Sequence, residues 1–148
     1  MNAKSEKTVS MTVRLDPKLK YGLEILARKQ YRNLSSVVEM TLNELVNKEF
    51  DGYNLPYLHD IWDVYEQDKL VKLALIAPEI LSYDEQKIWR VIEEFGDAWK
   101  NSSKSINSVN WQTIRENWKN IIDIANGKKE MSVLNKDTYD EFEDDIPF

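Results

Sequence analysis

The last twelve residues gather the side chains best suited to a specific chemical interaction. Residues 137–148 contain six Asp or Glu and no Lys or Arg. The chain closes on Asp144, Asp145, Ile146, Pro147 and Phe148. Carboxylates form charge-assisted hydrogen bonds with basic groups, and a terminal carboxylate can be captured in a dedicated site. The pattern predicts a docking peptide for a basic partner, with an ordinary solvated acidic tail as the alternative.

The closing Asp-Asp-Ile-Pro-Phe resembles the acidic tip of bacterial single-stranded DNA-binding proteins. The resemblance implies that Phe148 enters an apolar pocket on a partner and that a basic residue holds its α-carboxylate. It also implies that Asp144 and Asp145 lie along a basic ridge of that partner. The implied partners are host proteins that bind this tip. The whole chain does not resemble that family, which uses a β-barrel, because only one strand is predicted here.

A second set of candidate residues lies near the N-terminus, where polar and apolar residues alternate. This alternation predicts a half-buried strand over residues 9–15, with Val9, Met11, Val13 and Leu15 on its apolar side. Its polar side carries Ser10, Thr12 and Arg14. A guanidinium can pair bidentately with guanine, and a hydroxyl group can form hydrogen bonds with several of the bases. The alternative for this polar side is a solvated strand face with no ligand.

Two helices are expected after this strand. Asp16-Pro17 is a good N-cap followed by Pro at the first helical position, and it predicts a helix to about Lys29. Ser35 is the expected N-cap of the second helix, after a turn that contains Asn33. The start of that helix would anchor a phosphate through backbone N–H groups and a hydroxyl. The candidate phosphate-anchoring residues are Ser35, Ser36, Val37, Lys4 and Lys7.

A lone strand leaves a row of unpaired backbone groups, which a second copy of the chain could pair across a two-fold axis. From Ser10 to about Val46 the chain resembles a ribbon-helix-helix domain of the Arc, MetJ and CopG type. The resemblance is carried by the apolar strand positions and by Leu34-Ser35-Ser36-Val37-Val38. It implies a homodimer whose paired strands lie in the major groove of double-stranded DNA, and such dimers can assemble further on DNA. It also implies that Ser10, Thr12 and Arg14, on the outward side of the strand, are the candidate readers of DNA bases.

The expected fold is mainly α: this ribbon-helix-helix domain, a small helical domain and a disordered acidic tail. The boundaries follow composition and turn signals. They are a flexible arm over 1–8, the DNA-binding domain over 9–50, a hinge over 51–56, the helical domain over 57–127 and the tail over 128–148. All five Trp lie in the helical domain. Such a set could stack bases, but aromatic residues at helical spacing usually pack together in a core.

Composition excludes several classes of function. The chain has no Cys and one His, so neither thiol chemistry nor a His cluster for a metal is available. We expect no cofactor and no catalysis, because no nucleophile, metal set or phosphate-binding Gly loop accompanies the carboxylates. No segment resembles a membrane span or a signal peptide, so the expected compartment is the cytoplasm. The net charge of the chain is −6, but residues 1–50 have a net charge of +3. Contacts with phosphates require such local positive charge.

Together these features predict a sequence-specific double-stranded DNA-binding protein that acts as a transcriptional repressor. Its tail would mimic the tip of single-stranded DNA-binding proteins and dock proteins of replication and repair. The alternative is an interaction protein encoded by a phage or plasmid, which recruits or competes for host enzymes that bind that tip. An antitoxin with a toxin-wrapping C-terminal extension is a third, weaker hypothesis.

Overall fold

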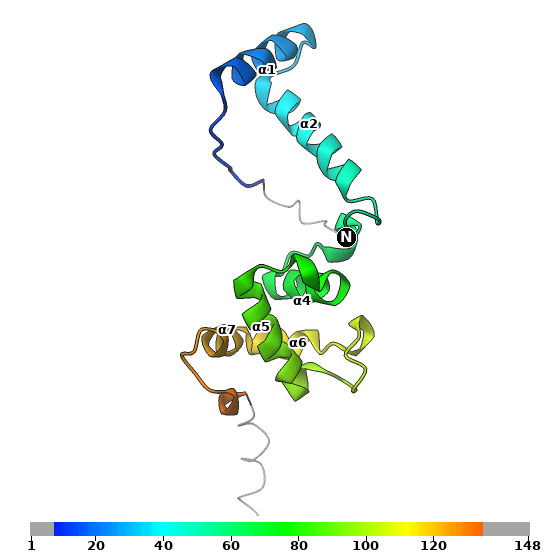
Figure 1. Cartoon of the computed structure of the whole chain (residues 1–148), viewed down its shortest axis with the longest axis vertical. Coiled ribbons are helices and arrows are strands. Elements are labelled where there is room, and N and C mark those ends of the chain that lie inside the picture. The colour runs from blue at the N-terminus through cyan, green and yellow to red at the C-terminus, as the bar shows by residue number, and fades with distance from the viewer. Residues whose placement is uncertain (1–7, 135–148) are drawn as a thin grey trace, which may run out of the picture. The chain divides into compact units, whose positions relative to one another are not determined.

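A computed structural model describes residues 8–134 of the chain. The chain divides into two compact units, with the boundary between Glu49 and Phe50 (Figure 1). We call them unit 1 and unit 2 and describe each by itself. The described part of unit 1 is a pair of helices preceded by an extended arm, and unit 2 is a small helical domain with its own core.

Unit 1 contains α1 (Pro17–Lys29) and α2 (Leu34–Glu49), joined by a short turn (Figure 1). The Asp16 carboxylate accepts hydrogen bonds from the backbone N–H groups of Lys18 and Leu19, at 2.9 and 3.3 Å. Pro17 follows at the first helical position, where its missing N–H is not needed. The predicted start and end of the first helix are therefore confirmed.

The second helix is capped by a different residue from the one expected. The Asn33 side chain accepts a hydrogen bond from the Ser36 N–H at 2.7 Å, and the Asn33 carbonyl accepts one from the Val37 N–H at 3.2 Å. Asn33 is thus the N-cap, two residues before the predicted Ser35. Asn and Ser cap helices equally well, so composition does not distinguish them. The preceding Tyr31 adopts φ 53°, which completes the reversal of the chain.

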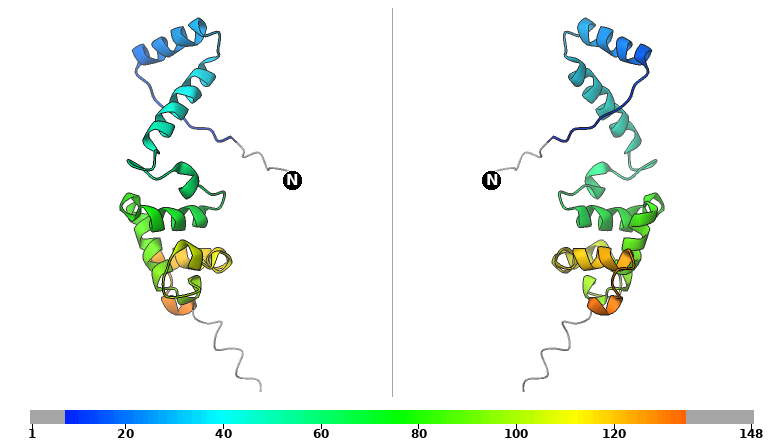
Figure 2. Two further views of the ribbon diagram at one scale, coloured as in Figure 1. Left: turned by 90° about the vertical axis from the view of Figure 1, so that its right-hand side faces the viewer. Right: turned by 90° about the vertical axis from the view of Figure 1, so that its left-hand side faces the viewer.

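The strand predicted over residues 9–15 is absent. Across residues 8–134 the structure contains no β-strand, and the one β-bridge joins Trp99 to Val109 in unit 2. Figures 1 and 2 accordingly draw residues 8–16 as coil. A strand is defined by hydrogen bonds to a neighbouring strand, and no described segment supplies them. The apolar side is also uncovered, since Val9 is 90% and Met11 85% exposed.

The resemblance to the ribbon-helix-helix family is therefore wrong, because that fold requires a strand. The expected fold class is corrected with it: the described chain is mainly α and carries no N-terminal ribbon. Alternation of apolar and polar residues predicts which side of a segment can be buried. It does not by itself supply a partner that accepts and donates the ladder hydrogen bonds, and this is why the prediction failed.

Unit 2 is built from short helices that follow one another closely. They are α3 (Leu58–Ile61), α4 (Glu66–Ile76), α5 (Tyr83–Glu94), α6 (Trp111–Glu116) and α7 (Trp118–Ala125). Single 3-10 turns lie at Pro78–Ile80, Gly96–Ala98, Ile106–Ser108 and Met131–Val133. Local signals set several of these boundaries. Ser82 and Glu85 form a reciprocal capping box at the start of α5, and Gly127, at φ 74°, follows the end of α7.

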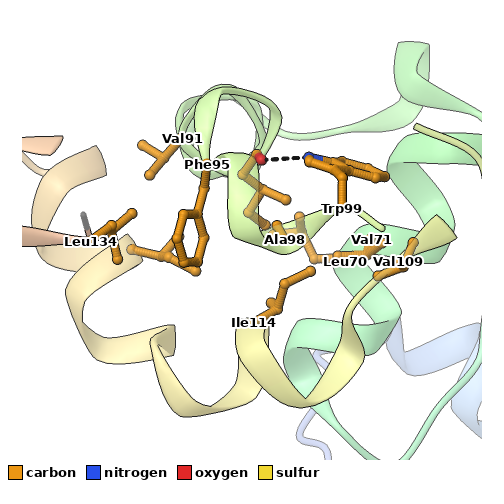
Figure 3. Packing of buried hydrophobic residues seen from close by; sticks show 11 residues of the cluster. Leu70, Val71, Val91, Phe95, Ala98, Trp99, Val109, Ile114 and Leu134 are labelled. Carbon is orange, nitrogen blue, oxygen red and sulfur yellow. Dashed lines mark hydrogen bonds between the residues drawn. The ribbon is translucent and has the colours of Figure 1, made fainter. Parts of the chain in front are cut away.

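The core of unit 2 lies between α4, α5, α6 and α7 (Figure 3). Its fully buried members include Val71, Ile92, Phe95, Ile114 and Ile121. The buried Trp99 indole N–H donates to the Ile92 carbonyl at 3.0 Å, as Figure 3 shows. Four of the five Trp are part of this cluster or packed against it: Trp89, Trp99, Trp111 and Trp118. They serve as core residues rather than as a base-stacking surface.

Candidate nucleic-acid interface

The three predicted base readers lie in the extended arm of unit 1. Ser10, Thr12 and Arg14 are exposed, and so are the apolar residues between them. The arm leads directly into the Asp16 cap of α1, so the cap fixes where the arm joins the helix. No regular ladder aligns the three side chains in this part of the chain. Their role in reading bases stays a prediction.

The predicted phosphate anchors at the start of α2 are already engaged in helix capping. The Ser36 N–H donates to the Asn33 side chain, and the Val37 N–H to the Asn33 carbonyl. Val37 is also buried, at 2% exposure. Ser35 is exposed. A phosphate at this helix start would compete with the Asn33 carboxamide for the Ser36 N–H, although an exposed helix N-terminus still attracts anions.

A cluster of basic side chains extends from the arm to the turn after α1. We call it the basic cluster. It contains Arg14, Lys18, Lys20, Arg28, Lys29 and Arg32. All six residues are exposed, and the same stretch contains two acidic residues, Asp16 and Glu24. Exposed cations concentrated on one small unit are the electrostatic signature expected of a phosphate-binding surface.

Neither acidic residue in this stretch is free to neutralise the whole basic cluster. The Asp16 carboxylate caps α1 through two backbone N–H groups. Glu24 lies 3.9 Å from the Lys20 ammonium in an exposed pair one helical turn apart, which contributes little. Arg28 and Lys29 occupy the last turn of α1, where they also complement the helix dipole. That structural role is compatible with contacts to phosphate.

Sequence reasoning singled out Arg14 but missed the other members of the basic cluster as a group. The signal was present in the charge count of the first fifty residues. The positive charge was not assigned to particular side chains, because the predicted DNA contacts were placed on the polar face of the expected strand. In the structure, Lys18, Lys20, Arg28 and Lys29 all come from α1. The Arg32 guanidinium lies 3.4 Å from the Met40 sulfur of α2.

The remaining predicted residues lie outside the described part of the chain. These are Lys4 and Lys7 of the arm and Asp144, Asp145, Ile146, Pro147 and Phe148 of the docking tip. The last described residue, Leu134, packs into the core of unit 2 at 5% exposure. The acidic segment therefore begins directly beyond a residue that is anchored in unit 2.

The carboxylates singled out for possible catalysis and the one His of the chain lie on the surface of unit 2. Glu93 and Glu94 are both exposed, and His59 is paired with Asp60 on the surface at 3.3 Å. Within residues 8–134, no group of three His, Cys, Asp or Glu side chains could hold a metal ion. None of the helices in that range is both long enough and apolar enough to cross a membrane.

Charged side chains of unit 2 act as structural contacts. The Lys72 ammonium donates to the Asp63 carboxylate at 2.8 Å and thereby lowers the pKa of Asp63. The Asp84 carboxylate raises the pKa of Lys87 in the same way, by a 2.8 Å pair on the first turn of α5. One pair lies within the start of α5, and the other joins α4 to the segment before it.

Comparison with known proteins adds no relative from which a function could be transferred. The chain matches no protein-family model, no curated protein and no solved structure.

Proposed function

We propose that the chain binds double-stranded DNA through unit 1 and connects that DNA to other proteins through its acidic terminal segment. In this proposal it binds specific sequences and represses transcription at the bound site. The observation that carries the DNA-binding part is the basic cluster: six exposed Lys or Arg between residues 14 and 32, against two acidic residues that are engaged within unit 1.

The charge of unit 1 contrasts with that of the segment that follows. Residues 51–100 carry five Lys or Arg against eleven Asp or Glu, whereas the whole chain has a net charge of −6. Affinity for a polyanion depends on local cations, because each neutralised phosphate releases condensed counterions. A DNA contact is therefore expected at the basic cluster of unit 1 rather than in the acidic segment over residues 51–100.

Sequence preference is assigned to Arg14, with Ser10 and Thr12 beside it on the arm. An Arg side chain that pairs with the O6 and N7 atoms of guanine contributes roughly 1–3 kcal/mol of discrimination against another base. Lys18 and Lys29, by contrast, would contact phosphates and contribute equally on all sequences. The two roles are separable by mutation.

The test is selection of duplexes from a random library, followed by fluorescence anisotropy with the enriched and a scrambled duplex. Arg14→Ala is expected to reduce the preference for the enriched duplex more than ten-fold, while Lys29→Ala weakens both duplexes alike. Arg90→Ala, an exposed change on α5 of unit 2, is the matched control and should leave both affinities unchanged. If the wild type binds no duplex at low salt, the proposal is wrong.

The docking part of the proposal concerns residues 137–148, which lie outside the described residues. It rests on the pairing of six carboxylates with the apolar Ile146-Pro147-Phe148 sequence. A partner would combine an apolar pocket with basic groups. Recruitment of host enzymes to the bound DNA and competition for those enzymes are both consistent with it. The antitoxin hypothesis is set aside, since residues 66–134 pack around their own core.

This part is tested by capture of tip-binding enzymes from nuclease-treated bacterial lysate. Phe148→Ala should abolish capture, whereas Phe142→Ala changes the same residue type within the same acidic segment and should retain it. Equal capture by both variants would indicate a general electrostatic attraction and would count against a specific docking tip.

A further inference from the structure

Unit 1 buries almost none of its apolar side chains. Within its described residues, 8–49, two side chains are buried: Ala27 at 4% and Val37 at 2% exposure, where α1 and α2 pack together. Ten large hydrophobic residues in the arm and the two helices are exposed instead. They are Val9, Met11, Val13, Leu15, Leu19, Tyr21, Ile25, Leu26, Leu42 and Leu45.

Six of these ten residues line two open hollows rather than lying as isolated spots. On α1, Leu19, Ile25 and Leu26 line an open hollow. Gly22 lies in the same hollow, and a Cβ atom there would have no neighbour within 4 Å. A second hollow on α2 is lined by Leu34, Val38 and Leu42, together with Val9 of the arm.

A unit of this kind lacks the means to stay folded alone. Chains of about 40 residues usually need disulfides, metals or oligomerisation to compensate for a small core. The chain has no Cys, and the described residues provide no metal site. Contact between two helices with two buried side chains is far less than a stable domain requires, so the exposed faces need a permanent cover.

We propose that a second copy of the chain provides this cover, so that unit 1 is completed as a symmetric homodimer through the outer face of α1, the apolar face of α2 and the arm. Ten side chains that are 39–90% exposed present an apolar area on the order of 1,000 Å² per chain, at roughly 100 Å² each. A stable interface of standard size buries ~800 Å² per partner. The available surface is therefore sufficient.

The charges on these faces suit self-association. The α1 hollow has two charged lining residues, Asp16 and Lys18, and both lie at the start of the helix rather than along its apolar stretch. Glu39 is the one charged residue of the α2 hollow. Depletion of charge at the centre is typical of stable interfaces. A permanent cover must be present in the same amount as unit 1, and a second copy of the chain meets this condition.

This inference goes beyond the proposed function and does not depend on it, because it follows from the uncovered apolar faces alone. Its consequence for DNA binding is that one molecule would carry two basic clusters. Two linked contacts raise the effective concentration of the second once the first has formed.

The test is the mass of the full chain in solution, measured by sedimentation over a dilution series. The wild type is expected at twice the 17.5 kDa chain mass. Leu26→Glu and Leu42→Glu each place a charge on one proposed face and should shift the mass to that of one chain. Ile106→Glu is the control, since Ile106 is exposed to a similar extent in unit 2, and it should remain a dimer.

Far-UV circular dichroism keeps the test decisive if the variants lose structure. Helix content should fall in parallel with the mass on dilution and in both unit 1 variants, because α1 and α2 depend on the cover. A monomer at all concentrations with unchanged helix content would overturn the proposal. So would a dimer that survives both unit 1 substitutions, or one that Ile106→Glu dissociates equally well.

Discussion

Arg115 of α6 donates two hydrogen bonds to the carboxylate of Asp68 on α4, which is 2% exposed and 47 residues away in sequence. The guanidinium also stacks on the Tyr65 ring at 4.3 Å. The Asp68 carboxylate raises the pKa of Arg115. This bidentate pair joins α4 to α6. The Asp68 side chain is buried, whereas the Arg115 side chain is partly exposed to water.

That difference predicts unequal effects of the two substitutions. Arg115→Met would leave the Asp68 carboxylate buried without a partner, and the free energy of unfolding should fall by roughly 3–5 kcal/mol. Asp68→Asn keeps a polar acceptor, and the partly exposed guanidinium can turn to water, so the loss should be about 2 kcal/mol. Urea unfolding followed by Trp fluorescence reports on unit 2 alone, since all five Trp lie there. Equal losses would contradict the argument.

Acid should weaken unit 2 through Asp63. Its hydrogen bond from Lys72 lowers the pKa of Asp63 below the usual 3.8. A carboxylate with a lowered folded-state pKa adds stability at pH values above its unfolded pKa, and this part is lost as pH falls through the folded value. Wild type should therefore exceed Asp63→Asn in urea midpoint at neutral pH and converge with it as pH falls below the usual carboxyl pKa of 3.8. Glu79→Gln, at an exposed position, should show no comparable convergence.

The capping box at the start of α5 should contribute measurably to the stability of unit 2. The Ser82 hydroxyl accepts from the Glu85 N–H, and the Glu85 carboxylate accepts from the Ser82 N–H at 2.8 Å. Ser82→Ala removes one of these bonds and should cost about 1 kcal/mol. For a domain of this size, the Tm should fall by about 4–8 °C. Ser102→Ala, on an exposed loop, should leave the Tm unchanged.

Salt dependence would distinguish phosphate contacts from base contacts in the basic cluster. Each neutralised phosphate contributes about −0.9 to the slope of log affinity against log salt concentration. Lys18→Ala and Lys29→Ala should each reduce the magnitude of that slope by about 1. Lys128→Ala, at an exposed position in unit 2, should not change it. Identical slopes for all variants would mean that these α1 side chains make no contact with the DNA phosphates.

Helix starts and stops could be predicted where the determining hydrogen bonds are local. Asp16-Pro17 and Ser82 with Glu85 each place an acceptor within three residues of the donors it satisfies, so both helix starts depend on local sequence, and the Asp16-Pro17 prediction was confirmed. The start of α2 was less predictable, because Asn33 and Ser35 are both good caps. The choice between them depends on how the turn leaves α1, where the Arg32 N–H donates to the Ala27 carbonyl.

The predicted strand failed for the opposite reason, since its hydrogen bonds would have had to come from residues far along the chain. For the same reason, the sequence did not predict the basic cluster as a group or the exposed apolar faces of unit 1. An alternation such as that from Val9 to Leu15 indicates which side chains could be buried, but the extent of burial depends on what packs against them.

By itself, the sequence determined the helical stretches with local caps, the Trp-rich helical segment, the uneven distribution of charge and the acidic segment ending in Ile-Pro-Phe. These properties depend on near neighbours or on composition, so they can be read along the chain. Tertiary structure alone decided that Arg115 meets Asp68, that Trp99 is buried against Ile92, and that the arm of unit 1 forms no strand among the described residues. Each of these outcomes depends on contacts between distant residues, whose free energy is settled only when the helices pack.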